Sequence, residues 1–297
     1  VLLPRPCPAW WAPQARLLGR GVYRVPTPAE CGGVPDPYAL LETVRRVRAE
    51  GGRPRLLVLS VADDPTATVP PPEVLHEAVE AAAAEGLHVV SDETWRDTLH
   101  HPRDTVLVGP AEMDHERVTV VCDLAGALLP PALPAAVAAP AAAAAAYALA
   151  EPDEIVERLS AAVRLHARVA DAVRHALLAA GAFARPPQAG RHLYADLGPL
   201  RPALAARGVG DAQDLEDFLG ARLGMPAPGG HRFGDDIDAL RVRLSTGPLL
   251  GATQQERLAS LTAPDPLELP HVERALSMFG SAFDDLRADA QRMEPPR

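Results

Sequence analysis

The chain has 297 residues, of which 47% are apolar but only 4% aromatic, and its formal net charge is −10. Nucleic acids and anionic membranes both require a basic surface, so the charge disfavours both as partners. Every basic residue is an arginine, and no lysine occurs in the sequence. The three cysteines lack CxxC spacing and indicate neither a disulfide framework nor a zinc site, so we expect a reduced, cytoplasmic protein without a bound metal.

In chain order, the first half alternates strand and helix patterns. We expect strands over residues 1–3, 55–61, 87–90 and 118–121, because short apolar runs there are bounded by turn residues. Helices are expected over 37–50, where Asp36 is placed to cap the first turn, and over 72–85, ended by Gly86. This alternation predicts an α/β domain with a mostly parallel sheet and helices on both faces, which we bound at 1–150.

The second half follows a different pattern. A long helix over 152–180 links the parts of the chain, and we expect Val156, Leu159 and Val163 to begin its buried stripe. Strands over 192–197 and 240–244 alternate with helices over 211–223, 256–261 and 271–287. We therefore expect a linking segment at 151–180 and a smaller α+β domain at 181–297. The apolar stretch 124–150 contains four prolines and is not expected to form one membrane-spanning helix.

Four segments in this order resemble the class I/II aminotransferases, the pyridoxal-phosphate (PLP) enzymes of fold type I, over essentially the whole chain. LSVADDPTATV at 59–69 resembles the strand followed by Asn-Pro-Thr-Gly, and VVSDETWRD at 89–97 resembles the strand ending in Ser-Asp-Glu-x-Tyr. VVCDLAGAL at 120–128 resembles the strand before Ser-x-Ser-Lys-Ala. RVRLS at 241–245, preceded by PGGHRFGDD, resembles the late Arg-Leu-Ser strand.

The resemblance implies that the cofactor site lies at the carboxyl ends of the parallel strands. It places Asp92 at the aspartate that pairs with the pyridinium nitrogen, and Arg243 at the arginine that clamps the substrate carboxylate. Asp64 stands at the asparagine and Trp95 at the tyrosine that hydrogen-bond the ring oxygen. Trp10 and Trp11 lie close to the position of the aromatic residue that stacks on the ring, which is Pro8 here.

Several positions of the resemblance carry residues of the wrong chemistry. Asp123 stands at the phosphate-binding serine, where a carboxylate repels a phosphate, and Gly126 stands at the lysine that forms the imine. The family's glycine-rich phosphate loop would lie before Val1, so we expect the N-terminal part of the family fold to be missing. PLP is therefore expected to bind weakly or not at all, without covalent attachment.

Each candidate side chain also has an ordinary structural interpretation. Asp92 would bind a cationic ring or cap the following turn, and Arg243 would clamp a carboxylate or pair with Asp235 or Asp236. Trp95, His100 and His101 would form a new pocket with a titrating base, or a surface loop. The three carboxylates at 64, 92 and 123 would converge on a cation or serve only as turn residues.

Three functions remain open. The first is a repurposed pocket that binds a carboxylate-bearing small molecule, or acts on it without PLP, in bacterial specialised metabolism. The second is a non-catalytic partner subunit of an active aminotransferase, and the third is the effector domain of a regulator. The resemblance implies a dimer, either of two identical chains or with an aminotransferase paralogue. The arginine, alanine, glycine and proline bias indicates a GC-rich genome such as that of an actinobacterium.

Overall fold

The computed structural model describes residues 1–113, 116–122 and 139–293. The chain is divided into two compact units. The first comprises Val1–Asp64, Thr68–Arg164 and Gln188–Gly190, and the second comprises Pro65–Ala67, Leu165–Pro187 and Arg191–Arg297. Among the described residues, no helix is both long enough and apolar enough to cross a membrane.

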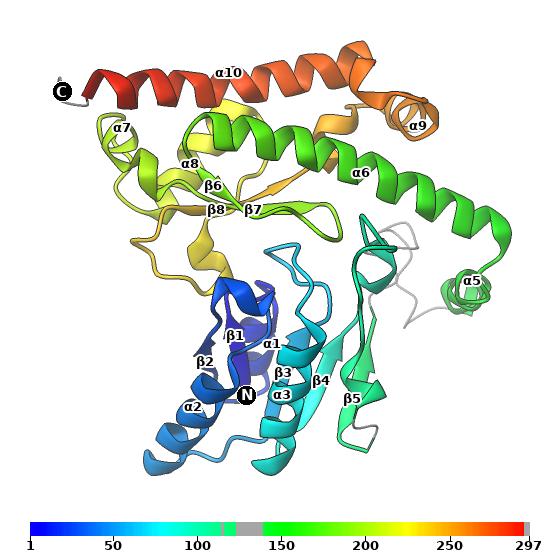
Figure 1. The fold of residues 1–297 in the computed structure, drawn as a ribbon, viewed down its shortest axis with the longest axis vertical. Helices are drawn as coiled ribbons and strands as arrows, with labels where there is room; N and C mark the ends of the chain where they lie inside the picture. Colours follow the sequence, from blue (N-terminus) through cyan, green and yellow to red (C-terminus); the bar gives the residue numbers. More distant parts are fainter. Residues whose placement is uncertain (114–115, 123–138, 294–297) are drawn as a thin grey trace. The chain divides into compact units, whose positions relative to one another are not determined.

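The first unit is built on a five-stranded sheet in the order β2-β1-β3-β4-β5 (Figure 1), and every neighbouring pair of strands is parallel. The strands are β1 (Leu2–Arg5), β2 (Tyr23–Pro26), β3 (Leu56–Ser60), β4 (His88–Asp92) and β5 (Val118–Val121). The predicted parallel sheet is confirmed. The sequence pattern missed β2, a four-residue edge strand that ends in a proline, because such a short run has little periodicity to detect.

Helices cover both faces of this sheet, as predicted. On one face α2 (Pro37–Ala49) and α3 (Pro72–Ala84) pack their buried residues Leu40, Val44 and Leu75 against Leu57 and Leu59 of β3. On the other face α1 (Trp11–Leu17) joins Leu3 and Cys7 in a separate apolar cluster. The predicted cap of α2 is present, because the Asp36 carboxylate accepts a hydrogen bond of 2.9 Å from the Ala39 backbone N–H.

Two helices follow the sheet. These are α5 (Ala139–Leu149) and the long helix α6 (Asp153–Ala179), which the division between the units cuts between Arg164 and Leu165. The predicted buried stripe of α6 is wrong at its start, since Val156 is 44% exposed. The stripe becomes buried only from Leu165 onward, where Val169, Val173 and Leu177 enter the core of the second unit.

The second unit has a three-stranded antiparallel sheet in the order β6-β7-β8. Its elements are β6 (Phe183–Ala184), β7 (His192–Asp196), α7 (Arg201–Ala205), α8 (Ala212–Leu223), β8 (Arg241–Ser245), α9 (Gln254–Thr262) and α10 (Pro270–Met293). Leu193 and Leu244 point from the sheet into a core with α8 and with Phe279 and Phe283 of α10. Strand residues alternate between two faces, so the opposite face carries polar side chains from β7 and β8.

Candidate functional site

Two neighbouring strands of the first unit end in carboxylates. Asp63 and Asp64 follow β3 and are only 4% and 3% exposed, while Asp92 is the last residue of β4. The strand ends adjoin, because the Val61 N–H donates to the Asp92 carbonyl oxygen at 3.3 Å. Two buried carboxylates and one half-buried carboxylate therefore lie at this edge of the sheet.

Asp92 caps the turn that follows β4, as its structural interpretation predicts. Its Oδ1 atom accepts a hydrogen bond of 3.0 Å from the Thr94 backbone N–H, which fixes the turn after β4. The side chain is half-buried at the carboxyl end of the strand. This hydrogen bond supports the interpretation of Asp92 as a turn residue.

A buried glutamate that the sequence analysis did not single out, Glu93, holds the loop after β4 in place. Glu93 is 7% exposed, accepts 3.1 Å and 2.7 Å hydrogen bonds from Ser91 and Arg96, and thereby pins the chain after β4. Arg96 also donates to Glu112 at 2.9 Å. The bond to Glu93 is the largest of the causes that raise the pKa of Arg96. The i,i+3 spacing of Glu93 and Arg96 was the available sequence signal.

Trp95 packs against a segment far away in the sequence. Its indole would lie 3.7 Å from a Cβ added at Gly190, and it joins an apolar cluster with Ala62, Val69 and Ala189. The same segment is held by the loop that follows Trp95, since the Gly190 N–H donates to the Thr98 hydroxyl at 3.0 Å. Trp95 is therefore a half-buried wall of the first unit rather than a free surface residue.

The two neighbouring histidines have different environments. His100 is 8% exposed, and its Nε2 atom lies 2.9 Å from the Gly190 carbonyl oxygen. It lines a cavity of about 570 Å³ whose walls also include Leu99, Leu149, Ile155 and Leu159. His101 is exposed at a turn. Of the pair, His100 alone has the enclosed position that a titrating base in a pocket requires.

The two candidate tryptophans of the N-terminal part also differ. Trp11 is 8% exposed and packs with Leu3 and Cys7 in the cluster beneath α1, where it is part of the core. Trp10 is 44% exposed and has the accessible ring. Of the remaining candidates, Asp123 and Gly126 lie outside the described residues. In the part of the chain that the structure describes, no group of three His, Cys, Asp or Glu side chains is arranged to hold a metal ion.

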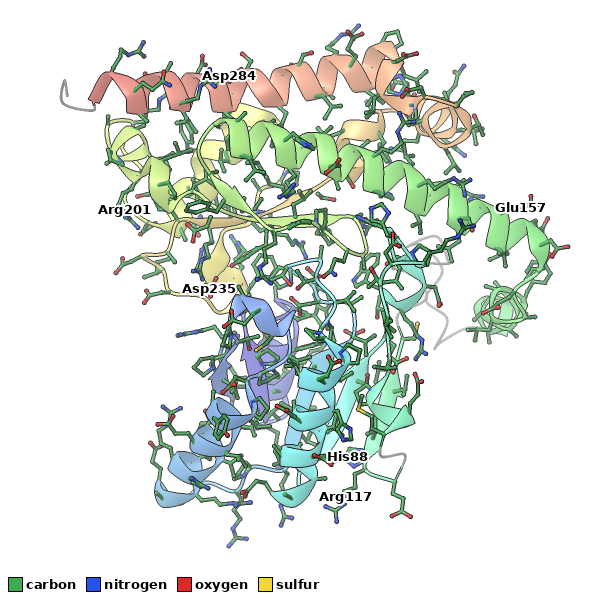
Figure 2. All side chains as sticks on the ribbon, viewed as in Figure 1. His88, Arg117, Glu157, Arg201, Asp235 and Asp284 are labelled. Carbon is green, nitrogen blue, oxygen red and sulfur yellow. The ribbon has the colours of Figure 1, made fainter. Side chains whose placement is uncertain are left out.

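In the second unit, Arg243 lies on the polar face of the sheet. Its Cα register partner on β7 is Tyr194, and its guanidinium carbon lies 4.8 Å from the centroid of the Phe233 ring. The proposed structural partner Asp235, labelled in Figure 2, bonds to other groups, namely the Tyr194 hydroxyl at 2.7 Å and Arg241 at 3.1 Å. The salt bridge expected as an alternative therefore forms at Arg241. The distance from Arg243 to the Phe233 ring is within the range of a cation–π contact.

A buried histidine that the sequence analysis did not single out lies beside Arg243. His192 is 8% exposed on β7, and burial lowers its pKa well below the ordinary value of 6.5, with further lowering by the charges of Arg243, Arg191 and His166. The Thr246 hydroxyl donates to the Arg191 carbonyl at 3.1 Å and lies 2.6 Å from Nδ1 of His166. His192 is thus a neutral imidazole among cationic groups, suited to hydrogen bonding rather than to carrying charge.

Comparison with known proteins identifies the fold. The profile of the family described as aminotransferase class I and II matches residues 1–215. Aspartate aminotransferase from Thermus thermophilus, solved with maleate, is 21% identical, with a TM-score of 0.67 over 95% of this chain and 69% of that one. N-succinyldiaminopimelate aminotransferase from Mycobacterium tuberculosis is 20% identical, with a TM-score of 0.70 over 95% and 71%.

Aromatic aminotransferase from Pyrococcus horikoshii is 17% identical, with a TM-score of 0.70 over 96% of this chain and 72% of that one. The sequence matches no curated protein significantly. Identities this low establish a shared fold and leave the reaction open. The family profile covers well over half of the chain and includes the strand ends that carry Asp64 and Asp92. The chain therefore belongs to the class I and II aminotransferases and has their α/β fold.

Proposed function

We propose that this chain is a member of the aminotransferase fold that does not transaminate through PLP and instead binds a carboxylate-bearing small molecule. One observation supports the proposal: the sequence contains no lysine, although the resemblance assigns Asp92 and Arg243 to a ring-pairing aspartate and a carboxylate-clamping arginine. A carboxylate ligand needs an oriented guanidinium, which Arg243 provides, whereas an imine with PLP needs a lysine. Its setting would be specialised metabolism in the cytoplasm of an actinobacterium.

On this proposal the residues present do not fit PLP. Besides an imine-forming lysine, the cofactor needs cationic and N–H donors for its phosphate. In the first unit the neighbouring strand ends carry the carboxylates of Asp63, Asp64 and Asp92, and Arg96 is bonded to Glu93 and Glu112. We therefore expect at most weak, non-covalent binding of this cofactor.

Arg243 would bind the carboxylate through its planar N–H groups. The guanidinium carbon lies 4.8 Å from the centroid of the Phe233 ring, a cation–π contact that helps to position the group. Arg241, two residues earlier on the same face, is already bonded to Asp196 and Asp235. A charge-assisted pair of this kind contributes about 2 kcal/mol, or about thirtyfold in affinity.

Maleate is a suitable first probe, because the Thermus aspartate aminotransferase was solved with it. We expect saturable binding by isothermal titration calorimetry and a loss of at least about tenfold in Arg243→Ala. Arg274→Ala is the matched control, since it removes the same charge from an exposed position of α10 in the same unit. Equal maleate affinity in the wild type, Arg243→Ala and Arg274→Ala would show that Arg243 does not bind the carboxylate.

A second experiment tests the cofactor. The protein is titrated with PLP while its absorbance is followed, and sodium borohydride is added to trap any imine. We expect no saturable spectral change and no trapped adduct, because no lysine is present to form one. A tight, defined PLP spectrum would contradict the argument about the phosphate, even if borohydride trapped nothing.

A second candidate, a non-catalytic subunit paired with an active aminotransferase, is favoured by one observation. Exposed apolar side chains gather on α5 and the first half of α6, where Tyr147, Leu149 and Val156 are 51%, 61% and 44% exposed. A partner would bury such side chains. Light scattering after size exclusion distinguishes the cases: a homodimer that binds maleate supports the repurposed pocket, and a monomer that binds maleate only with an aminotransferase paralogue supports the subunit.

A further inference from the structure

A hollow lined by arginines lies at the end of the parallel sheet opposite to Asp64 and Asp92. It encloses about 490 Å³ and is lined by the end of α2, the connection that leads into β3 and the end of α3. Its basic residues are Arg48, Arg53 and Arg55, and its only acidic one is Glu85. The lining therefore carries an excess of two positive charges in a chain whose net charge is −10.

One of the three arginines has a structural task. Arg48 forms an ion pair with Glu85 and donates to the Glu85 backbone carbonyl at 2.8 Å. It thus ties the last turn of α2 to the last turn of α3 and neutralises the only acidic group of the hollow. Because Glu85 balances its charge and accepts hydrogen bonds from two of its N–H donors, Arg48 adds less to the binding of an anion than an unpaired arginine would.

Arg53 and Arg55 are different. Both are exposed, and neither makes an ion pair or a side-chain hydrogen bond with any described residue. Buried Pro54 lies between them and fixes the backbone, and the Arg55 carbonyl accepts a hydrogen bond of 2.8 Å from the His88 N–H next to the first pair of β3 and β4. Both side chains line the same hollow, one on each side of Pro54.

Glycines keep the floor of the hollow open. A Cβ at Gly52 would lie 2.6 Å from Cγ1 of Val47, so the chain passes too close to α2 for any side chain there. Gly51 and Gly86 have φ angles of 82° and 68°, and a Cβ at either would meet nothing within 4 Å. Gly51 and Gly86 therefore leave the backbone at the ends of α2 and α3 uncovered, so a ligand is able to approach the neighbouring arginines closely.

Helix carboxyl ends repel anions, and this effect must be weighed against the arginines. Here the carbonyl groups at both ends are bonded within the chain: the Gly52 N–H donates to Val47 O at 2.8 Å, and the Leu87 N–H donates to Ala82 O at 2.9 Å. These hydrogen bonds reduce the partial negative charge that the two helix ends expose, whereas Arg53 and Arg55 have no ion-pair partner among the described residues. The arginines dominate, and the field in the hollow favours an anion.

We propose that this hollow, the distal arginine pocket, binds a compact polyanion that carries phosphate groups. Guanidinium groups match phosphate oxygens in pairs, and the two that line this hollow suit a group such as a diphosphate. The volume suits a small molecule, and the lining has no aromatic ring on which a nucleotide base would stack. His88 and Arg117, labelled in Figure 2, lie at this same end of the sheet.

The test uses inorganic pyrophosphate as the probe and isothermal titration calorimetry at low salt. We expect saturable binding to the wild-type chain and a loss of at least about tenfold in Arg53→Ala/Arg55→Ala. Arg45→Ala/Arg46→Ala is the matched control: it removes two exposed charges from the same helix end, outside the lining, and should change the affinity less than about threefold. Circular dichroism establishes that both double variants remain folded.

Two results overturn the proposal. One is the absence of saturable pyrophosphate binding to the wild-type chain, and the other is an equal loss in the two double variants, which would indicate a diffuse charge effect. Arg243→Ala should leave pyrophosphate binding unchanged, and Arg53→Ala/Arg55→Ala should leave maleate binding unchanged. If pyrophosphate affinity falls in Arg243→Ala and not in Arg53→Ala/Arg55→Ala, the anion binds elsewhere and the distal arginine pocket is wrong.

Discussion

Buried His192 should make the stability of the second unit sensitive to acid. Burial and the charges of Arg243, Arg191 and His166 lower its pKa well below 6.5 in the folded protein, while the unfolded chain returns it to the ordinary value. As the pH falls below 6.5, the unfolded state takes up a proton that the folded state refuses. Acid therefore stabilises the unfolded state, and stability is lost as the pH falls.

The size of the effect follows from proton linkage. While His192 stays neutral in the folded protein, lowering the pH to one unit below its unfolded pKa reduces the free energy of unfolding by about 1.4 kcal/mol. Above that pKa both states are neutral and the effect vanishes. Carboxylates and other histidines also titrate, so the useful quantity is the difference between the wild type and His192→Gln, which removes the titrating group and keeps a polar side chain.

Urea unfolding at about pH 7.5 and about pH 5.5 measures this difference. We expect His192→Gln to lose about 1.4 kcal/mol less stability than the wild type between these conditions. His175→Gln is the matched control, because it removes an imidazole from an exposed position of α6 in the same unit. The same pH dependence in His192→Gln and the wild type would refute a neutral, buried His192.

Two further predictions concern stability. Gly33 has a φ of 99°, and a Cβ there would lie 2.4 Å from Cβ of Asp63, so Gly33→Ala should lower the free energy of unfolding by about 3 kcal/mol or more. At Gly19 a Cβ would meet nothing within 4 Å, and Gly19→Ala should lower it by about 1 kcal/mol. Similar urea midpoints for the two variants would show that the end of β3 is not tightly packed. Leu177 is 0% exposed and Leu178 is 38% exposed, so Leu177→Ala should cost about 3 kcal/mol and Leu178→Ala under about 1 kcal/mol. Thermal unfolding measures the second pair, and a reversed order would place the helix stripe on the wrong face.

Local patterns were sufficient for much of the fold. The helix over Pro37–Ala49 begins at the predicted cap, and the strand over Arg241–Ser245 lies where strict alternation of apolar and polar residues indicated. Both depend on signals carried within a few residues, namely a capping carboxylate and a period of two. The short helix Trp11–Leu17 and the edge strand Tyr23–Pro26 escaped detection, because seven and four residues hold too little periodicity.

The candidate site shows the same limit. The positions of Asp64 and Asp92 at strand ends followed from the sequence, since parallel strands place their carboxyl ends at one edge. The ion-pair partner of Asp235 did not follow: Arg241 and Arg243 share one face of the strand, and only the folded geometry selects Arg241.

The sequence by itself determined the alternation of strands and helices, the motifs of the family and the absence of lysine, all of which are carried by neighbouring residues. Tertiary structure decided which distant segments meet. His100 bonds to a carbonyl 90 residues further along the chain, and α6 is buried only where the second unit supplies a core. Such contacts depend on the packing of the whole chain, and no local pattern encodes the partner that lies opposite each side chain.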